Sequence, residues 1–258
     1  MSKPLLITLL PSSGVDTSRW VLAHYDYAYT ERPHAPIFHV LALKSWGLTK
    51  DQYPGLVVDG KVAAYGSKGI TLHLDPQMPE EKRLMPDDEA GQAKVLEMAN
   101  YAGNIVGGAV VNWSYWNLLK YKSVVWSSVT TSVPWYEKLT LRVAFPLIRW
   151  AMYKGLELDQ AVADEALKTI YEGFDKIDAL LADGRTFMYG DRLTYADLIT
   201  AACLGPMILA QGYHGMLPNH ALCPVFMQKV YAELRQRPTG LYIQRMYDLH
   251  RPAQLLQV

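Results

Sequence analysis

The chain has 258 residues, half of them hydrophobic, and its 25 Lys and Arg are balanced by 25 Asp and Glu. This length and apolar content suffice for one large domain or two small ones with a sizeable core. A neutral chain without a basic excess is not typical of a nucleic-acid-binding protein. The two cysteines, Cys203 and Cys223, and the seven histidines show no metal-ligand spacing, so we expect no metal and a reducing compartment.

Apolar runs in the chain are too short for a membrane span. The longest candidate, "GNIVGGAVVNWSYWNLL", is interrupted by Asn104, Asn112 and Asn117, whereas a span needs about 18 apolar residues or more. The N-terminal "LLITLL" is shorter than the apolar region of a signal peptide and is better interpreted as a buried strand. We therefore expect a cytoplasmic protein.

The first 75 residues alternate between strand and helix signals. "LLITLL" predicts a strand that ends before Pro11, and "TSRWVLAHYDYAY" predicts a helix. "GLVVDGKVAAYG" predicts two short strands joined by a turn at Asp59-Gly60, and "SKGITLHL" predicts a helix capped by Ser67. Residues 30–53 carry no clear pattern.

After the Pro-rich, charged segment "DPQMPEEKRLMPDD" the strand signals stop, and four helices are predicted. The clearest lies over residues 159–183, where apolar side chains recur every three or four residues between Asp159 and Gly184 as caps. In another, Pro134 is expected at the start and Pro146 at a kink. The four predicted helices cover residues 87–125, 134–154, 159–183 and 194–212.

Two acidic residues in "MYGDRLTYADL" raise the question of catalytic carboxylates. Thr194 and Asp197 have the spacing of a capping box, in which each side chain bonds the other residue's backbone N–H. We therefore interpret Asp197 as a structural cap, and Asp191 as a turn or ion-pair residue rather than an acid catalyst.

The segment around this capping box also resembles a sequence signature of a known protein family. "FMYGDRLTYADLITAA" resembles the G-D-x-x-T/S-x-A-D signature in the helical domain of glutathione transferases. Five further segments resemble that family in the same order along the chain, with "YPGLVVDG" placing Pro54 at its cis-proline. They are "SRWVLAHYDYAYTE", "YPGLVVDG", "YGSKGI", "RLMPDDEAGQAKVLEMANYA" and "LRQRPTGLYIQR".

The resemblance implies an α+β fold of two domains. Residues 1–76 would form a thioredoxin-like α/β domain that binds glutathione, and residues 77–86 a linker. Residues 87–258 would form an all-helical bundle that holds the acceptor pocket. Two departures are visible: Gly66 replaces the usual acid before the serine, and Tyr53 replaces the valine before the proline.

The resemblance also implies where the chemistry lies. Members of the family stabilise the thiolate of glutathione with a donor at the start of the first helix, where the helix dipole assists. Alignment of the first helix puts Ser12 at the serine-donor position, with Ser13 as second choice. Neither tyrosine nor cysteine occurs between Met1 and Trp20, and the alternative for "PSSG" is a polar turn.

Glutathione itself would contact the peptide of Tyr53-Pro54 and the hydroxyl and N–H of Ser67, which could equally be a plain N-cap. Gly66 supplies no carboxylate for the γ-glutamyl ammonium, so another acid is needed or glutathione binds weakly. Lys44 and Lys50 are candidates for the glycyl carboxylate, with solvated surface lysines as the alternative.

An aromatic-rich stretch is expected to form the pocket for the second substrate, the electrophile that accepts the glutathione sulfur. Residues 104–153 hold five of the seven tryptophans, and in the family this region faces the glutathione sulfur. We expect Trp113, Tyr115 and Trp116 to line a pocket for an apolar electrophile, with core or dimer packing as the alternative.

Two functions follow from these residues. The first is a detoxification-type glutathione transferase that attacks a hydrophobic electrophile, with glutathione as co-substrate, as a homodimer that pairs the first domain of one chain with the helical domain of the other. The second is a non-catalytic transferase-like module that binds an apolar ligand or a protein partner.

Overall fold

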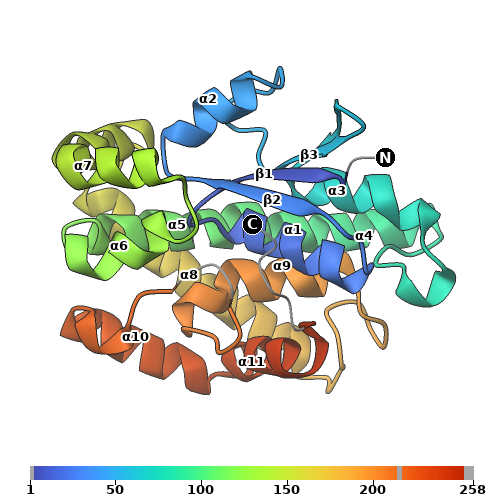
Figure 1. Cartoon of the computed structure of the whole chain (residues 1–258). Coiled ribbons are helices and arrows are strands. Elements are labelled where there is room, and N and C mark those ends of the chain that lie inside the picture. The colour runs from blue at the N-terminus through green and yellow to red at the C-terminus, as the bar shows by residue number, and fades with distance from the viewer. Residues whose placement is uncertain (1–2, 214–216, 253–258) are drawn as a thin grey trace.

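A computed structural model describes residues 3–213 and 217–252, so the last six residues of the expected helical domain lie outside the described residues. A small sheet has the strand order β2-β1-β3-β4 (Figure 1). Strand β1 (Leu5–Leu9) pairs in parallel with β2 (Thr30–His34) and antiparallel with β3 (Gly55–Val58). Strand β4 (Lys61–Tyr65) completes an antiparallel hairpin with β3.

The strands predicted around residues 5–10 and 55–66 are confirmed. Val58 pairs with Lys61, which leaves Asp59 and Gly60 as a two-residue turn with φ angles of 47° and 76°. Both angles lie in the left-handed region that such a tight hairpin turn requires. The unassigned residues 30–53 hold strand β2 and helix α2 (Phe38–Lys44). β2 is an edge strand, and its Pro33 weakens the strand pattern in the sequence.

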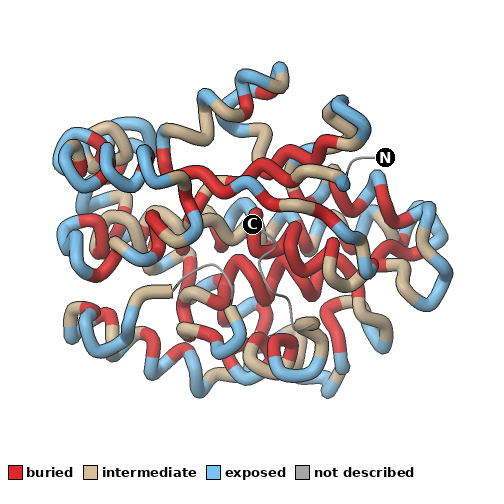
Figure 2. The backbone as a smooth tube through the Cα atoms, in the orientation of Figure 1, coloured by how far each residue is buried: buried red, intermediate tan, exposed pale blue. Residues whose placement is uncertain are grey.

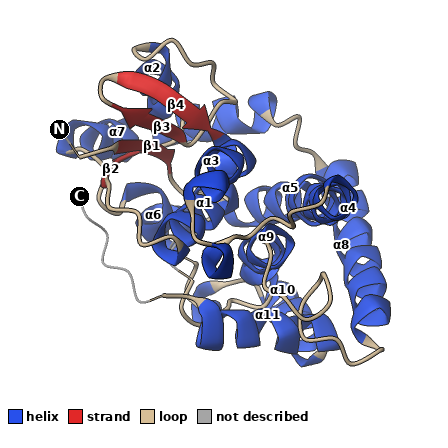
Figure 3. Ribbon diagram, turned by 90° about the vertical axis from the view of Figure 1, so that its right-hand side faces the viewer, coloured by secondary structure: helices blue, strands red, loops and turns tan. Residues whose placement is uncertain are grey.

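Helices cover both faces of the sheet. α1 (Ser13–His24) and α3 (Gly66–Leu74) lie on the face toward the helical region, and α2 lies on the other face (Figure 3). The expectation that Ser67 caps α3 is wrong, since Tyr65 occupies the N-cap position and Ser67 is the second helical residue. The Ser67 hydroxyl instead forms a 2.8 Å hydrogen bond with the hydroxyl of Tyr195.

The remainder of the chain is helical, as predicted. The single helix expected over residues 87–125 is divided, because a π-helix at Tyr101–Val106 and a turn at residues 119–121 interrupt it. The helix expected over residues 194–212 ends at Leu204. The helices are α4 (Glu89–Asn100), α5 (Gly107–Leu118), α6 (Lys122–Thr130), α7 (Trp135–Gly155), α8 (Gln160–Leu181), α9 (Tyr195–Leu204), α10 (Val225–Gln236) and α11 (Pro238–His250).

The predicted start and kink of α7 and the predicted caps of α8 are confirmed. Pro134 precedes α7, and the helix is kinked at Ala144, where φ is −101° and ψ is 15°, two residues before Pro146. Asp159 accepts a 2.7 Å hydrogen bond from the N–H of Val162 and so caps α8. Gly184, just beyond α8, has a φ of 81°, which suits a residue without Cβ.

Helix α9 forms the middle of the core. All ten of its residues are buried, and it packs against α1, α4 and α11. Figure 2 shows the buried segments running through β1, α1 and α9. Both bonds of the capping box at its start are present. The Asp197 carboxylate also accepts hydrogen bonds from the N–H of Met188, at 2.6 Å, and from the hydroxyl of Tyr242.

Burial of this carboxylate raises the pKa of Asp197, although its hydrogen bonds oppose the shift. Its donors come from three places in the chain: the start of α9, the turn at Met188, and α11. Asp197 therefore joins three segments at the centre of the protein, and its role is structural.

We expect Asp197→Ala to lower the free energy of unfolding by roughly 3–5 kcal/mol, since several buried donors lose their acceptor at once. Chemical denaturation measures this loss. The matched control is Asp159→Ala at the exposed cap of α8, which should cost about 1 kcal/mol. An Asp197→Ala protein as stable as the control would contradict the structural role.

Candidate functional site

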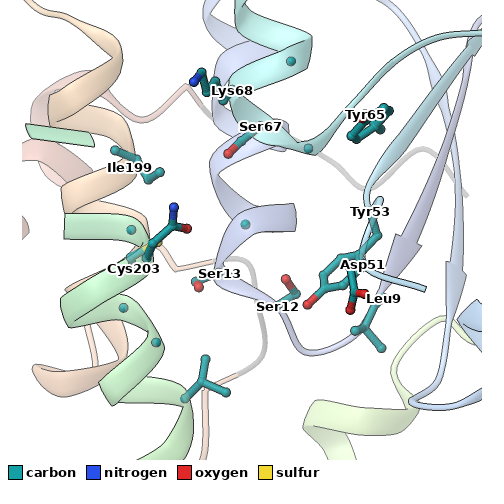
Figure 4. Close-up of a pocket in the computed structure, with 18 of the residues that line it drawn as sticks. Leu9, Ser12, Ser13, Asp51, Tyr53, Tyr65, Ser67, Lys68, Ile199 and Cys203 are labelled. Atoms are coloured by element: carbon teal, nitrogen blue, oxygen red, sulfur yellow. The ribbon is translucent and has the colours of Figure 1, made fainter. Parts of the chain in front are cut away.

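A cavity of about 1180 Å³ lies where the sheet domain meets the helical bundle (Figure 4). Its wall draws on the start of α1, the loop before β3, the start of α3, and the helices α4, α5, α7 and α9. The sequence-predicted residues Ser12, Ser13, Tyr53, Gly66, Ser67 and Tyr115 all line it. The fold therefore brings together residues that are more than 100 positions apart in the chain.

Ser12 is the N-cap of α1. Its hydroxyl accepts a 3.3 Å hydrogen bond from the N–H of Val15, which places the oxygen at the positive end of the helix dipole. The Tyr53 ring points toward Ser12, so that its phenol oxygen lies beside the Ser12 side chain (Figure 4). The Ser13 side chain lies instead near the thiol of Cys203 in α9, where it opposes the rise in the pKa of that thiol.

Two phenols lie beside Ser12. Burial raises the pKa of Tyr53, and the nearby charge of Asp51 adds to this, while the Ser12 side chain opposes it. The Tyr115 hydroxyl donates a 3.0 Å hydrogen bond to the carbonyl of Pro11, and burial raises the pKa of Tyr115 as well. Both phenols are therefore neutral donors at physiological pH.

The other end of the cavity is formed by the start of α3. The Tyr53–Pro54 peptide bond is cis, as the family resemblance implied, and the Pro54 carbonyl accepts a 2.9 Å bond from the N–H of Gly66. Gly66 has a φ of 66°, a conformation that disfavours a side chain at this position. Gly66, Ser67 and Lys68 line the cavity at a helix N-terminus without a side-chain cap, which is a typical setting for an anion.

Glycines shape the wall opposite Ser12. A Cβ on Gly103 would lie 2.5 Å from the side chain of Ile199, and one on Gly107 would lie 2.9 Å from Cys203. The π-helix and the start of α5 therefore approach α9 as closely as backbone allows. This close contact brings Ile199 and Cys203 to the cavity surface.

The expectation that Trp113 and Trp116 line the pocket is not met, since neither is among the described residues around the cavity. Trp113 is 2% exposed and packs edge-on against Tyr231, with ring centres 5.8 Å apart. The Trp116 indole donates a 3.1 Å hydrogen bond to Gln160 on the far side. Consecutive helical residues differ by about 100° in direction, so only one of these aromatic residues, Tyr115, faces the cavity.

Cys203 is not suited to thiol chemistry. Burial raises the pKa of its thiol to about 11, so the reactive thiolate is scarce at neutral pH. Within residues 3–213 and 217–252, no cluster of three or more His, Cys, Asp or Glu side chains could hold a metal. In the same residues, no helix combines the length and apolar character needed to cross a membrane.

Residues 160–241 match the family model for the glutathione S-transferase C-terminal domain. This segment contains α8, α9 and α10, and so includes the capping box. No curated protein sequence matches the chain.

Solved structures share the fold over nearly the whole chain. A possible glutathione S-transferase from Rhodopseudomonas palustris is 15% identical with a TM-score of 0.57, covering 100% of this chain and 99% of its own. A glutathione S-transferase from Methylobacillus flagellatus KT, solved with glutathione bound, is 17% identical with a TM-score of 0.53, covering 93% and 98%. The β-etherase LigF from Sphingobium sp. strain SYK-6 is 15% identical with a TM-score of 0.57, covering 95% and 99%.

Proposed function

We propose that the chain is a glutathione transferase-like protein that binds glutathione and activates the thiol for attack on an apolar electrophile, since residues 160–241 match the C-terminal domain of that family and the whole chain shares its fold. One observation carries this proposal: the Ser12 hydroxyl, at the N-terminus of α1, shares a cavity with the cis peptide at Pro54 and the uncapped start of α3. We further propose the division of labour expected from the sequence. Residues 1–76 hold glutathione, residues 77–86 are the linker, and residues 87–258 supply the acceptor wall.

Glutathione carries two carboxylates and one ammonium, and the cavity offers groups that suit the carboxylates. The N–H of Ser67 at the uncapped start of α3, with Lys68 beside it, suits the γ-glutamyl carboxylate. Lys50 lines the cavity and suits the glycyl carboxylate, whereas Lys44 is not among its described lining residues. Asp51 is the one acid among the described lining residues, but it lies beside Tyr53 and away from Ser67 (Figure 4), so it does not suit an ammonium on the same carbon as the carboxylate held at Ser67.

We propose that Ser12 stabilises the thiolate. Its oxygen accepts from the Val15 N–H, and its own proton faces the phenol oxygen of Tyr53, which is why Ser12 lowers the pKa of Tyr53. With glutathione bound, the Ser12 proton would turn to the sulfur and the Tyr53 hydroxyl would donate to Ser12 in its place. Hydrogen bonds in such a chain strengthen one another, so Tyr53 would act as a positioning residue that polarises Ser12. The thiol proton leaves to solvent; with an aryl halide as the electrophile, the thiolate sulfur bonds the ring carbon and the carbon–halogen bond breaks, so that halide leaves to solvent.

The acceptor side of the cavity is apolar. Leu96, Val111, Met152 and Ile199 line it together with Tyr115, which suits an apolar electrophile rather than a charged one. The glycine at position 66 favours the alternative of a non-catalytic binding module, because the usual acid is missing. Retention on immobilised glutathione, followed by a turnover assay with an aryl halide, separates the two functions.

Ser12→Ala is expected to raise the pKa of bound glutathione and to lower turnover at neutral pH by roughly 10- to 100-fold, as for loss of one hydrogen bond to a charged group. The loss should shrink as pH rises, because the thiol then ionises without help. A pH–rate profile from about pH 6 to pH 10 measures both effects. Affinity for glutathione should change less.

Ser13→Ala is the matched control, because Ser13 neighbours Ser12 but its side chain lies near the thiol of Cys203. Its profile should resemble that of the unmodified protein. If Ser13→Ala shows the large effect and Ser12→Ala does not, Ser13 is the donor. If neither shifts the profile, the proposal for Ser12 is wrong.

Tyr53→Phe tests the positioning role. It removes the phenol next to Ser12 and keeps the ring, so turnover should fall about 3- to 10-fold with the profile shifted toward higher pH. Tyr115→Phe removes the other phenol, which bonds the Pro11 carbonyl, and should leave the profile in place. Equal profile shifts in both variants would indicate general disturbance of the cavity and not a specific chain through Ser12.

We also propose that the chain forms a homodimer in the reducing cytoplasm, with the sheet domain of one copy against the helical domain of the other. The support is the family fold, since members of the family pair in this way. Light scattering at micromolar concentration should give twice the chain mass of 29.1 kDa. A value equal to the chain mass would reject the dimer.

A further inference from the structure

The outward face of α7 is apolar. Six large hydrophobic side chains on it are between 51% and 77% exposed, namely Trp135, Tyr136, Leu139, Val143, Leu147 and Trp150. Their spacing of three or four residues places them along one side of the helix. The opposite side, with Leu141, Phe145 and Ile148, is buried against the protein.

A helix that is apolar on both sides is normally covered on both sides. Single exposed hydrophobic residues are ordinary, but a continuous row that includes two tryptophans marks an interaction surface. Figure 1 places α7 at the edge of the molecule, and the exposure of the row shows that the described residues leave this side uncovered. The row is therefore available to a partner.

The charge around this face is one-sided. Residues 119–156 contain six basic residues and a single acid, Glu137, in a chain whose net charge is zero. Glu137 is 1% exposed and turned inward, where it bonds the His34 ring at 2.6 Å. The exposed surface of α7 is therefore positively charged.

Three basic residues of α7 lie beside its apolar row. Lys138, Arg142 and Arg149 are four and seven residues apart, so they follow one flank of the apolar row. Within the described part of the chain, none of the three takes part in an ion pair. Their charges are therefore available to an anionic partner.

The α7 helix of a second copy is a poor match for this face. A two-fold interface brings the same patch of both subunits together. In an antiparallel pair of α7 helices, the basic flank of one would lie along the basic flank of the other, with no acid between them. Like charges so placed repel each other.

We propose that α7 docks on an anionic lipid surface, with its apolar row inserted among the lipids and its basic flank at the head groups. Tryptophans near both ends of the row, Lys and Arg beside it, and Leu and Val between them are the composition of helices that lie in a membrane interface. Such helices reach about 5–10 Å into the boundary between head groups and acyl chains.

Docking would place the cavity next to the lipids. Met152, Gly155 and Leu156, at the end of α7 and just beyond it, line the cavity described above. Apolar compounds that partition into the bilayer would then reach the cavity without crossing bulk water. The docking itself does not depend on glutathione turnover and is tested separately.

The experiment is sedimentation of the full chain with vesicles, one set of phosphatidylcholine alone and one with about a third phosphatidylserine. We expect binding to the anionic vesicles, weaker binding to the neutral ones, and loss of most binding at high salt. Tryptophan emission should shift to shorter wavelength on binding, since Trp135 and Trp150 leave water.

Two variants with matched controls locate the surface. Val143→Ser/Leu147→Ser/Trp150→Ser should abolish sedimentation, whereas Val225→Ser/Leu241→Ser, on the equally exposed α10 and α11 away from α7 (Figure 1), should not. Each basic residue at an anionic surface is worth about fivefold in partitioning, so Lys138→Glu/Arg142→Glu should weaken binding roughly 25-fold or more. Lys94→Glu/Lys229→Glu is its control.

All replaced side chains are exposed, so thermal unfolding of each variant should stay close to that of the parent protein. Failure to bind anionic vesicles, or binding that the α7 variants leave unchanged, would overturn the proposal. So would light scattering in which the parent is a dimer and Val143→Ser/Leu147→Ser/Trp150→Ser is a monomer, because α7 would then be a subunit interface.

Discussion

The position of α1 between the sheet and the helical domain is the constraint on which the rest of the structure depends. Its residues from Val15 to Leu22 are buried on all sides, including two charged ones. Asp16 accepts a 2.8 Å bond from Arg251, and Arg19 pairs with Glu31 of β2 at 2.5 Å. Because an unpaired buried charge is strongly destabilising, each pair holds α1 in a single position. That position fixes the Ser12 hydroxyl at the edge of the cavity.

Features with local causes could be predicted from the sequence. The 3.6-residue period of α8, its caps and the Asp59-Gly60 hairpin each depend on neighbouring residues, and the structure agrees with them. The partners of Asp16 and Arg19 are 235 and 12 residues away, so no local pattern indicates them. The π-helix is also non-local, because it follows from the close approach of Gly103 and Gly107 to α9. These contacts become visible only in the folded chain.

In the candidate site too, some residues could be predicted from the local sequence and others depend on contacts distant in the chain. Ser12 and Ser67 were identifiable because they follow a strand and begin a helix, positions that family resemblance marks. The sequence assigned Tyr53 to glutathione binding through its peptide bond to Pro54, but gave no sign of its phenol beside Ser12, which requires the loop before β3 to face α1. The prediction that Trp113 and Trp116 line the pocket was wrong for a reason that is visible in the sequence itself. Residues 113, 115 and 116 point in three directions on a helix, so they could not share one pocket.

Strand β2, which the sequence analysis did not find, connects the two proposed activities. Through Glu31 it binds α1 and so holds the N-cap at Ser12. Three residues on, His34 and the N–H of Ala35 bind both oxygens of Glu137, at 2.6 and 2.8 Å. Glu137 is the only acidic residue of α7. Because its carboxylate is bonded toward the inside of the protein, all charged side chains on the outer surface of the helix are basic. The edge of the sheet thus sets both the position of the thiol donor and the charge that α7 presents outside.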